Sequence, residues 1–240
     1  MLPVAILAGG LATRLRPLTE TIPKSLVEIN GKPFLWHQLR LLRENRVDHV
    51  VLCLSHLGEK VQDWAGDGRE FGLHIDYTFD GATLLGTAGA LKRAQPLLGE
   101  SFFILYGDSY LPIDWSAVES AFRHSGKTGL MTVYRNEGQW DTSNVEFEDG
   151  RILAYNKKLR TSRMRHIDYG LGVLRADALA RVPDGQAWDL ATLYGELLNA
   201  GELAGFEAPH RFYEIGSFGG IEELRAYLSR ERGGRERGSI

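Results

Sequence analysis

The chain of 240 residues contains only one cysteine, Cys53, and it lies inside the apolar run at 50–54. A single cysteine cannot form an internal disulfide, so a small disulfide-stabilised fold is excluded. Free cysteines are usually buried, and we therefore predict that Cys53 is a core thiol. The seven histidines form no H-x-x-H or H-E-x-x-H spacing, and the sequence predicts no zinc site.

The chain also lacks an excess of charge of one sign, and it lacks long hydrophobic runs. Lysine and arginine total 28 and aspartate and glutamate total 31, so the basic excess typical of a nucleic-acid binder is absent. No apolar run approaches the roughly 20 residues of a membrane span. The short apolar start at 1–8 follows no basic region and runs directly into Gly9 and Gly10, which favours a buried strand over a signal peptide. We expect a cytoplasmic protein that binds neither nucleic acid nor membrane.

Glycine is abundant, with 28 residues that lie at the ends of apolar runs. Between them, strand-like runs alternate with helical patterns through the first half of the chain. Strands are predicted at 4–8, 49–54, 73–79 and 102–106, and helices at 33–42, 59–65 and 87–94. This alternation predicts an α/β fold of the doubly wound, Rossmann-like kind, in which helices cover both faces of a parallel sheet.

The pattern changes after about residue 125, where short runs indicate antiparallel strands added to the same sheet. Strands are predicted at 129–135, 144–148, 151–155 and 167–174, and helices at 177–182 and 189–199. The turn at 148–150 joins two of these strands as a hairpin. We therefore predict one domain with a mixed sheet over 1–228. Residues 229–240 are dominated by arginine, glutamate and glycine, which predicts a flexible tail.

The most informative segment lies directly after the first predicted strand. Small residues end the strand and open a loop that is followed by cations: Leu7, Ala8, Gly9, Gly10, Thr13, Arg14 and Lys24. Small residues let backbone N–H groups approach an anion, and Arg14 and Lys24 would neutralise a polyphosphate. The segment is neither a G-x-G-x-x-G dinucleotide fingerprint nor a G-K-[ST] phosphate loop. Taken alone, the glycine pair is more typical of an ordinary turn.

Taken together, residues 9–24 resemble the signature of the sugar nucleotidyltransferases, roughly G-G-x-G-T-R-L-x-P-L-T followed by P-K. Ala12 is the one departure, because the family usually has a third glycine there and alanine disfavours a positive φ. The family joins a sugar 1-phosphate to a nucleoside triphosphate and releases pyrophosphate. The resemblance implies a fold of the nucleotide-diphospho-sugar transferase type, nucleotide contacts from the loop residues named above, and catalytic roles for Arg14 and Lys24.

Two later stretches extend the resemblance through the nucleotide-binding part. Residues 85–91 resemble the family's base-facing loop, which implies that Gly86 and Thr87 contact the nucleotide; alone, this stretch is an ordinary helix start. The apolar run at 102–106 leads to Asp108, and open α/β sheets bind ligands at such strand ends. The resemblance implies that Asp108 is catalytic and holds a metal ion, and a helix cap is the alternative.

The sugar-contacting motifs of the family are altered in this chain. Lys157 stands where the family commonly has the Glu of Glu-Lys-Pro, Lys158 matches its Lys, and Asp168 replaces the Asn of Asn-Ala-Gly. The resemblance implies that Asn144, Lys158, Asp168 and Gly170 contact the sugar and its phosphate. The departures predict an unusual sugar. A solvated basic turn at the two lysines is the alternative.

The segment at 212–217 resembles the family's W-x-D-x-G-T, whose Asp is the second metal ligand. Glu214 replaces that Asp, and its side chain, which is one methylene longer, can still reach Mg²⁺ by re-angling. A glutamate that caps Gly216 and Ser217 is the alternative. We therefore expect Mg²⁺ as the cofactor, held by Asp108 and Glu214.

These observations predict a nucleotidyltransferase with a nucleotide-binding half at about 1–125 and a sugar-binding half at 126–228. The implied substrates are a nucleoside triphosphate and a sugar 1-phosphate, and the resemblance is strongest to short guanylyltransferases of heptose or mannose 1-phosphates. The alternatives are a uridylyltransferase of an amino-sugar 1-phosphate, a non-catalytic nucleotide-sugar-binding regulator of the same fold, and a Rossmann-type oxidoreductase. The regulator is disfavoured because Arg14, Lys24 and Asp108 are all present, and the oxidoreductase because its fingerprint is absent. The sequence leaves open whether the protein forms a homo-oligomer.

Overall fold

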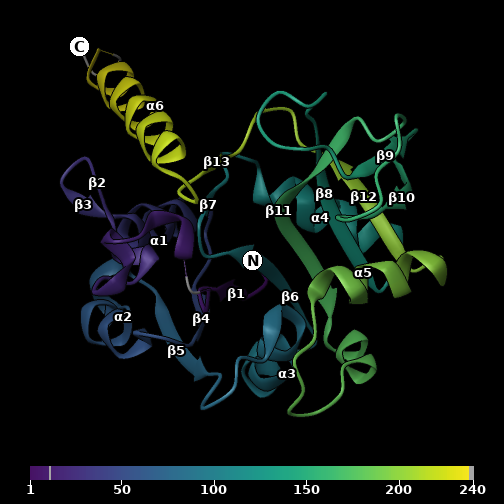
Figure 1. Ribbon diagram of the computed structural model, residues 1–240, viewed down its shortest axis with the longest axis horizontal. Helices are drawn as coiled ribbons and strands as arrows, with labels where there is room; N and C mark the ends of the chain where they lie inside the picture. The colour runs from purple at the N-terminus through teal and green to yellow at the C-terminus, as the bar shows by residue number, and fades with distance from the viewer. Residues whose placement is uncertain (11, 238–240) are drawn as a thin grey trace.

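The computed structural model of the chain describes residues 1–10 and 12–237, with side chains through Glu231 (Figure 1). The described strands form one large mixed sheet in the order β10-β9-β11-β6-β1-β4-β5, and β8 and β12 extend it from β11. The prediction of a doubly wound α/β fold with antiparallel additions is therefore confirmed. Among the described residues, no helix combines the length and the apolar character that a membrane crossing requires.

The parallel part of the sheet comes from the first half of the chain. In spatial order it consists of β6 (Ser101–Tyr106), β1 (Val4–Leu7), β4 (His49–Leu54) and β5 (His74–Phe79). Strand β1 is central, with Val4 in register with Val50 on one side and with Phe103 on the other. Because β1 is covered on both faces, its side chains are apolar without alternation. All of these strands end at the same edge of the sheet, where folds of this kind bind ligands.

Helices cover both faces of this sheet. One face packs against α1 (Phe34–Glu44), α2 (Gly58–Ala65) and α4 (Trp115–Ser125), and the other against α3 (Gly86–Leu98) and α5 (Leu190–Asn199). Neighbouring residues of β4 point to opposite faces, so Leu52 joins the first core and Cys53 joins the second. Cys53 is buried, which confirms the prediction of a core thiol.

The second half of the chain adds the antiparallel strands. The long strand β11 (His166–Arg175) pairs with β6 and with β8 (Gly129–Arg135), and β9 (Val145–Glu148) and β10 (Arg151–Tyr155) form the predicted hairpin. The pairing of β11 with β8 shifts register between Asp168 and Gly172. Such an irregularity bends a strand and re-aims its side chains. Because Leu171 pairs with Leu105, the bend lies beside the carboxyl end of β6.

Short elements and one long helix complete the edge where the parallel strands end. β7 (Ser109–Tyr110) pairs with β13 (Tyr213–Glu214), β2 (Glu28–Ile29) pairs with β3 (Lys32–Pro33), and 3-10 helices lie at Thr13–Leu15, Leu18–Glu20 and Lys24–Leu26. A further 3-10 helix at Arg69–Phe71 precedes β5 and lies at the opposite edge. In Figure 1 the yellow α6 (Phe218–Arg237) lies beside the purple N-terminal segments. A third apolar core packs Ile29 and Phe34 against Ile215 and Leu224, so residues from both ends of the chain meet here.

Some elements differ from the predictions. The sequence does not predict β12 (Leu203–Glu207), because its alanine and glycine have low strand propensity; pairing with β8 fixes its extended conformation. The predicted helix at 177–182 is a 3-10 helix at Ala176–Arg181. Helix α6 continues to Arg237, so residues 229–237 are helical where the sequence predicts a flexible tail, and arginine and glutamate are good helix formers. Residues 238–240 lie outside the described residues, and the division into a 1–228 domain and a tail stays a prediction.

Candidate active site

The glycine-rich loop leaves β1 between the ends of β4 and β6. The Ala8 N–H donates to the Cys53 carbonyl at 2.9 Å, and the Gly107 N–H donates to the Leu7 carbonyl at 2.9 Å. A Cβ on Gly107 would lie only 2.7 Å from that carbonyl oxygen, so only glycine allows the two strand ends to come this close. The start of the loop is therefore fixed against both neighbouring strands.

Ala12 adopts the left-handed conformation that favours glycine, with φ 48° and ψ 38°. Its carbonyl accepts hydrogen bonds from the Leu15 N–H at 3.1 Å and from the Thr19 hydroxyl at 2.8 Å. These two bonds stabilise the turn despite the alanine side chain. The departure from the family pattern therefore leaves a positive φ at this position.

A cavity of about 250 Å³ lies at the carboxyl ends of β1, β4 and β6. It is lined by most residues that the sequence predicts for nucleotide contacts, and by the predicted metal ligand: Leu7, Ala8, Gly9, Gly10, Lys24, Gly86, Thr87 and Asp108. Thr13 and Arg14 do not line this cavity, and both are exposed. Other lining residues were not predicted to contact a ligand, among them Asp80 and Leu84, which lie outside the motifs, and Tyr106, which lies in the run that leads to Asp108.

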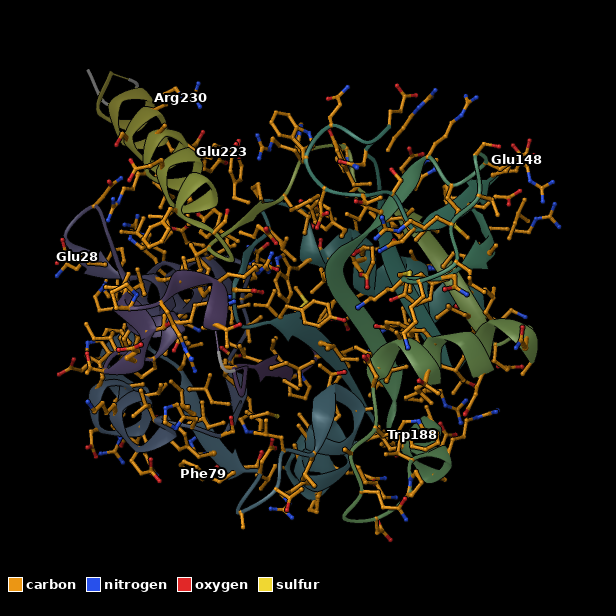
Figure 2. The ribbon with its side chains drawn as sticks, viewed as in Figure 1. Glu28, Phe79, Glu148, Trp188, Glu223 and Arg230 are labelled. Carbon is orange, nitrogen blue, oxygen red and sulfur yellow. The ribbon has the colours of Figure 1, made fainter. Side chains whose placement is uncertain are left out.

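The start of α3 forms another wall of this cavity. The Leu85 N–H donates to the Asp80 carboxylate at 3.1 Å, and the Ala88 N–H donates to the Trp188 carbonyl at 2.9 Å. Figure 2 shows Trp188 on the segment that precedes α5. A Cβ on Gly86, whose φ is 68°, would lie 2.7 Å from the Trp188 carbonyl oxygen. Both the backbone angle and the close contact therefore require glycine at position 86.

Thr87 also connects two helices. Its hydroxyl accepts the Leu190 N–H at 2.7 Å and lies 3.2 Å from the Asp189 carboxylate, to which it donates. Asp189 is the N-cap of α5, so Thr87 ties the start of α3 to the start of α5. The hydroxyl is therefore already engaged, although the residue lines the cavity.

Lys24 and Asp108 form an ion pair at the edge of the cavity. The Lys24 Nζ lies 2.8 Å from the Asp108 Oδ2, and the two side chains are 19% and 25% exposed. Lys24 begins a 3-10 helix, and Asp108 follows the end of β6. The fold thus brings together two predicted catalytic residues that are 84 positions apart. A cation suited to a phosphate and a carboxylate suited to a metal ion lie at one place.

A second cavity of about 300 Å³ adjoins the first, and Tyr106 and Asp108 line both. It is lined by predicted sugar-contacting residues and by the second predicted metal ligand: Asn144, Asp168, Gly170 and Glu214. Lys158 does not line this cavity, whereas Lys157 does, with its Nζ 5.5 Å from the centre of the Tyr106 ring. Other lining residues carry no family motif that could have revealed them: Ser109, Asp141 and Arg160.

Asp168 is held at the bend of β11 by hydrogen bonds. Its N–H donates to the Asn144 Oδ1 at 3.0 Å, the Gly170 N–H donates to its Oδ1 at 3.1 Å, and the Tyr155 hydroxyl donates to its Oδ2 at 3.3 Å. Burial raises the pKa of Asp168, and the nearby Lys157 lowers it by a smaller amount. The second cavity therefore contains a well-fixed carboxyl group whose ionised form is poorly solvated.

Glu214 lies next to Asp108 because β13 pairs with β7. Glu214 is in register with Ser109, and the Ile215 N–H donates to the Asp108 carbonyl at 2.9 Å. Burial raises the pKa of Glu214, and the Asp108 carboxylate raises it further. Two carboxylates that face one cavity are a donor set that hard divalent cations prefer, so these residues fit a metal ion.

Arg14 lies beside Glu214 rather than in the first cavity. Its charge lowers the pKa of Glu214, against the larger effect of burial. One guanidinium nitrogen lies 3.0 Å from where a Cβ on Gly216 would be. The missing side chain of Gly216 therefore makes room for Arg14. Each of the two carboxylates at the site thus has a basic residue close to it.

A separate group of metal-binding residue types lies at the amino ends of β4 and β5, away from the cavities. The ligand atoms of His49, His74 and Asp76 lie within 4.8 Å of one another. Both imidazole Nε2 atoms contact the Asp76 Oδ2, at 2.9 and 3.3 Å. Sequence spacing does not reveal this cluster, because His49 and His74 meet only through the pairing of two strands. The expectation of no zinc site is not tested by this arrangement.

The chain matches the family described as nucleotidyl transferase over residues 4–153. It is 30% identical over 247 residues to UTP--glucose-1-phosphate uridylyltransferase of Synechocystis sp., which covers 94% of this chain and 63% of that protein. It is also 30% identical over 217 residues to mannose-1-phosphate guanyltransferase beta-B of Xenopus laevis, which covers 88% of this chain and 60% of that protein. The chain thus spans 60–63% of the length of these relatives. The crystal structure of HddC from Yersinia pseudotuberculosis has a similar fold, with a TM-score of 0.79 and 23% identity over 95% of this chain and 100% of HddC.

Proposed function

Because the chain belongs to the nucleotidyl transferase family, we propose that it forms an NDP-sugar and pyrophosphate from a nucleoside triphosphate and a sugar 1-phosphate. The observation that carries the proposal is the pair of adjoining cavities that share Tyr106 and Asp108. The first cavity would bind the nucleotide and the second the sugar 1-phosphate. The two substrates would then meet beside Lys24 and Asp108, at the carboxyl end of β6. The proposal also places the protein in the cytoplasm.

The chemistry needs no covalent nucleophile, because a phosphate monoester is already an anion at neutral pH. An oxygen of the sugar phosphate would attack the α-phosphorus in line, and pyrophosphate would leave on the opposite side. The protein would position both substrates and neutralise their charge. Lys24 would contact the α-phosphate or the incoming phosphate, and Arg14 the leaving pyrophosphate. Lys157 is better placed than Lys158 to contact the sugar, because it lines the second cavity.

Asp108 and Glu214 would hold the divalent cation, which we take to be Mg²⁺. Once bound, the ion would reduce the repulsion between the two phosphates. Burial and Asp108 disfavour the ionised form of Glu214, and a cation between the carboxylates would stabilise that form. Lys24 and Arg14 would remain available for the phosphates themselves.

GTP with a heptose or mannose 1-phosphate is the proposed substrate pair. One relative of the chain is named a mannose-1-phosphate guanyltransferase, and HddC has also been solved complexed with GMP-PN. A uridylyltransferase of an amino-sugar 1-phosphate is the second candidate, because a relative from Neisseria meningitidis is named an N-acetylmuramate alpha-1-phosphate uridylyltransferase.

A matrix of five nucleotides against a panel of sugar 1-phosphates, scored by pyrophosphate release, tests the proposal. We expect release only when Mg²⁺, a nucleoside triphosphate and a sugar 1-phosphate are all present, and we expect it to be fastest with GTP. Faster release with UTP and an amino-sugar 1-phosphate would favour the second candidate. If no combination releases pyrophosphate, the protein is not a nucleotidyltransferase, and a regulator of the same fold becomes the better interpretation.

A further inference from the structure

An open groove of about 500 Å³ continues the second cavity. The groove shares Thr142 and Arg160 with the second cavity. The second cavity shares different residues, Tyr106 and Asp108, with the first. The three spaces are therefore arranged in series, and the groove lies at the end remote from the nucleotide cavity.

The groove carries positive charge that no acidic side chain balances. Residues 157–165, with the sequence KKLRTSRMR, contain five basic residues and no acidic residue. Arg160 and Arg165 of this segment line the groove. Neither forms an ion pair with any acidic residue in the part of the chain that the structure describes. Glu137, which also lines the groove, is already paired with Arg135 at 2.8 Å.

The two loops that form the groove are joined by hydrogen bonds. The N–H groups of Asn136 and Glu137 donate to the Arg165 carbonyl at 3.0 and 2.9 Å. The Gly138 N–H donates to the Ser143 Oγ at 3.2 Å. Because these bonds do not involve a ligand, the walls of the groove are formed before anything binds, and less ordering is needed on binding.

We propose that this groove binds a second anionic group of the sugar 1-phosphate, a carboxylate or a phosphate remote from the anomeric phosphate. The proposal rests on the proposed function and specifies its sugar as an acidic one. Guanidinium groups bind carboxylate and phosphate oxygens through paired N–H donors. In this arrangement the first cavity would bind the nucleotide, and the second would bind the sugar ring with its anomeric phosphate. Arg160 and Arg165 in the groove would bind the distal anion.

Three acceptors with one ring configuration test the proposal: mannose 1-phosphate, mannuronic acid 1-phosphate and mannose 1,6-bisphosphate. The measured quantity is kcat/KM for pyrophosphate release with GTP and Mg²⁺. We expect at least one acidic acceptor to exceed mannose 1-phosphate by tenfold or more. A comparison of mannuronic acid 1-phosphate with mannose 1,6-bisphosphate then shows whether the groove accepts a carboxylate or a phosphate.

Two matched variants assign the preference to the groove. Arg165→Gln should lower the ratio of acidic to neutral kcat/KM by tenfold or more. Arg163→Gln removes a neighbouring arginine that is paired with Glu146 at 3.2 Å and does not line the groove, so the ratio should not change. If all three acceptors react equally well in the parent protein, or if Arg165→Gln leaves the ratio unchanged, the inference is wrong while the proposed function stands. If no sugar 1-phosphate of the wider panel described under the proposed function releases pyrophosphate with any nucleotide, the proposed function fails, and this inference fails with it.

Discussion

Gly107 lies so close to the end of β1 that adding one methyl group at this position tests whether the ends of β1 and β6 position the site. In Gly107→Ala the new Cβ would lie 2.7 Å from the Leu7 carbonyl oxygen and 2.8 Å from the Ala8 Cα and Cβ. Carbon atoms in contact lie about 3.5–4.0 Å apart, so the methyl group requires a displacement of about 0.7 Å. Strand β1 is paired with β4 on one side and β6 on the other, and it cannot move without straining both pairings.

The cost follows from this geometry. Overpacking a buried position destabilises a protein by roughly 1–3 kcal/mol, and we expect about 2–3 kcal/mol because backbone atoms must move. For a chain of this size each kcal/mol lowers Tm by roughly 2–4 °C, so Tm should fall by roughly 4–12 °C. Asp108 is the next residue, and misplacing a catalytic group by about 1 Å costs on the order of a hundredfold in rate. We therefore expect turnover to fall by at least about tenfold.

Thermal melts followed by circular dichroism, together with pyrophosphate release measured well below Tm, check both parts of this prediction. Gly195→Ala is the matched control, because Gly195 lies inside α5 and a Cβ there would meet no atom within 4 Å. Alanine is also the better helix former, so the control should melt at the same temperature as the parent or above it. If Gly107→Ala melts with the parent and keeps normal turnover, the reasoning about the strand ends is refuted.

Further predictions concern the charged groups. Arg14→Ala and Lys24→Ala should each lower turnover by about a hundredfold or more, because both residues would neutralise phosphate charge, and the circular dichroism spectrum should not change. Near-normal turnover in either variant would contradict the proposed role of the substituted residue. Asp108→Asn should abolish the response of the rate to Mg²⁺. Glu214→Gln should raise the Mg²⁺ concentration needed for half-maximal rate, whereas Glu214→Asp should keep substantial activity. If the Mg²⁺ titration of Asp108→Asn or Glu214→Gln matches that of the parent, the substituted residue is not part of the metal site. Asp168→Asn should raise Tm at neutral pH. Burial raises the pKa of Asp168, so the stability contributed by its protonated form is lost as the pH rises through that raised pKa. The gain in Tm should therefore shrink as the pH is lowered, and a gain that is the same at every pH would contradict this account.

The strands that the sequence predicts best are those whose own residues are mostly apolar, because such a run is buried wherever it lies in the fold. The runs at 49–54 and 129–135 are mostly apolar, and the structure has β4 and β8 at those bounds. Strands β7 and β13 consist of two residues each, and their short sequences give no periodic signal. They form because each is the other's partner, and this pairing of distant segments brings Glu214 beside Asp108.

The candidate site shows the same division between local and long-range information. The loop residues of the first cavity could be predicted because they follow one another directly after β1. The choice between Lys157 and Lys158 could not, because it depends on a turn in which the Asn156 Oδ1 accepts the N–H groups of Lys158 and Leu159, both at 2.8 Å. That turn leaves Lys157 in the second cavity. The position of Arg14 beside Glu214 likewise depends on the packing of segments far apart in the sequence.

The pairing of charges at the site suggests how it tolerates two carboxylates before any ligand binds. Lys24 contacts Asp108, and Arg14 offsets part of the unfavourable environment of Glu214. A polyphosphate bound at this site would compete for the same cations, because phosphate oxygens bind lysine and arginine as carboxylates do. If phosphates drew Lys24 and Arg14 away, the carboxylates would lose their counter-charges, and a divalent cation would then become their most favourable partner. Nucleotide and metal should therefore strengthen each other's binding, and this coupling needs both cations and both carboxylates.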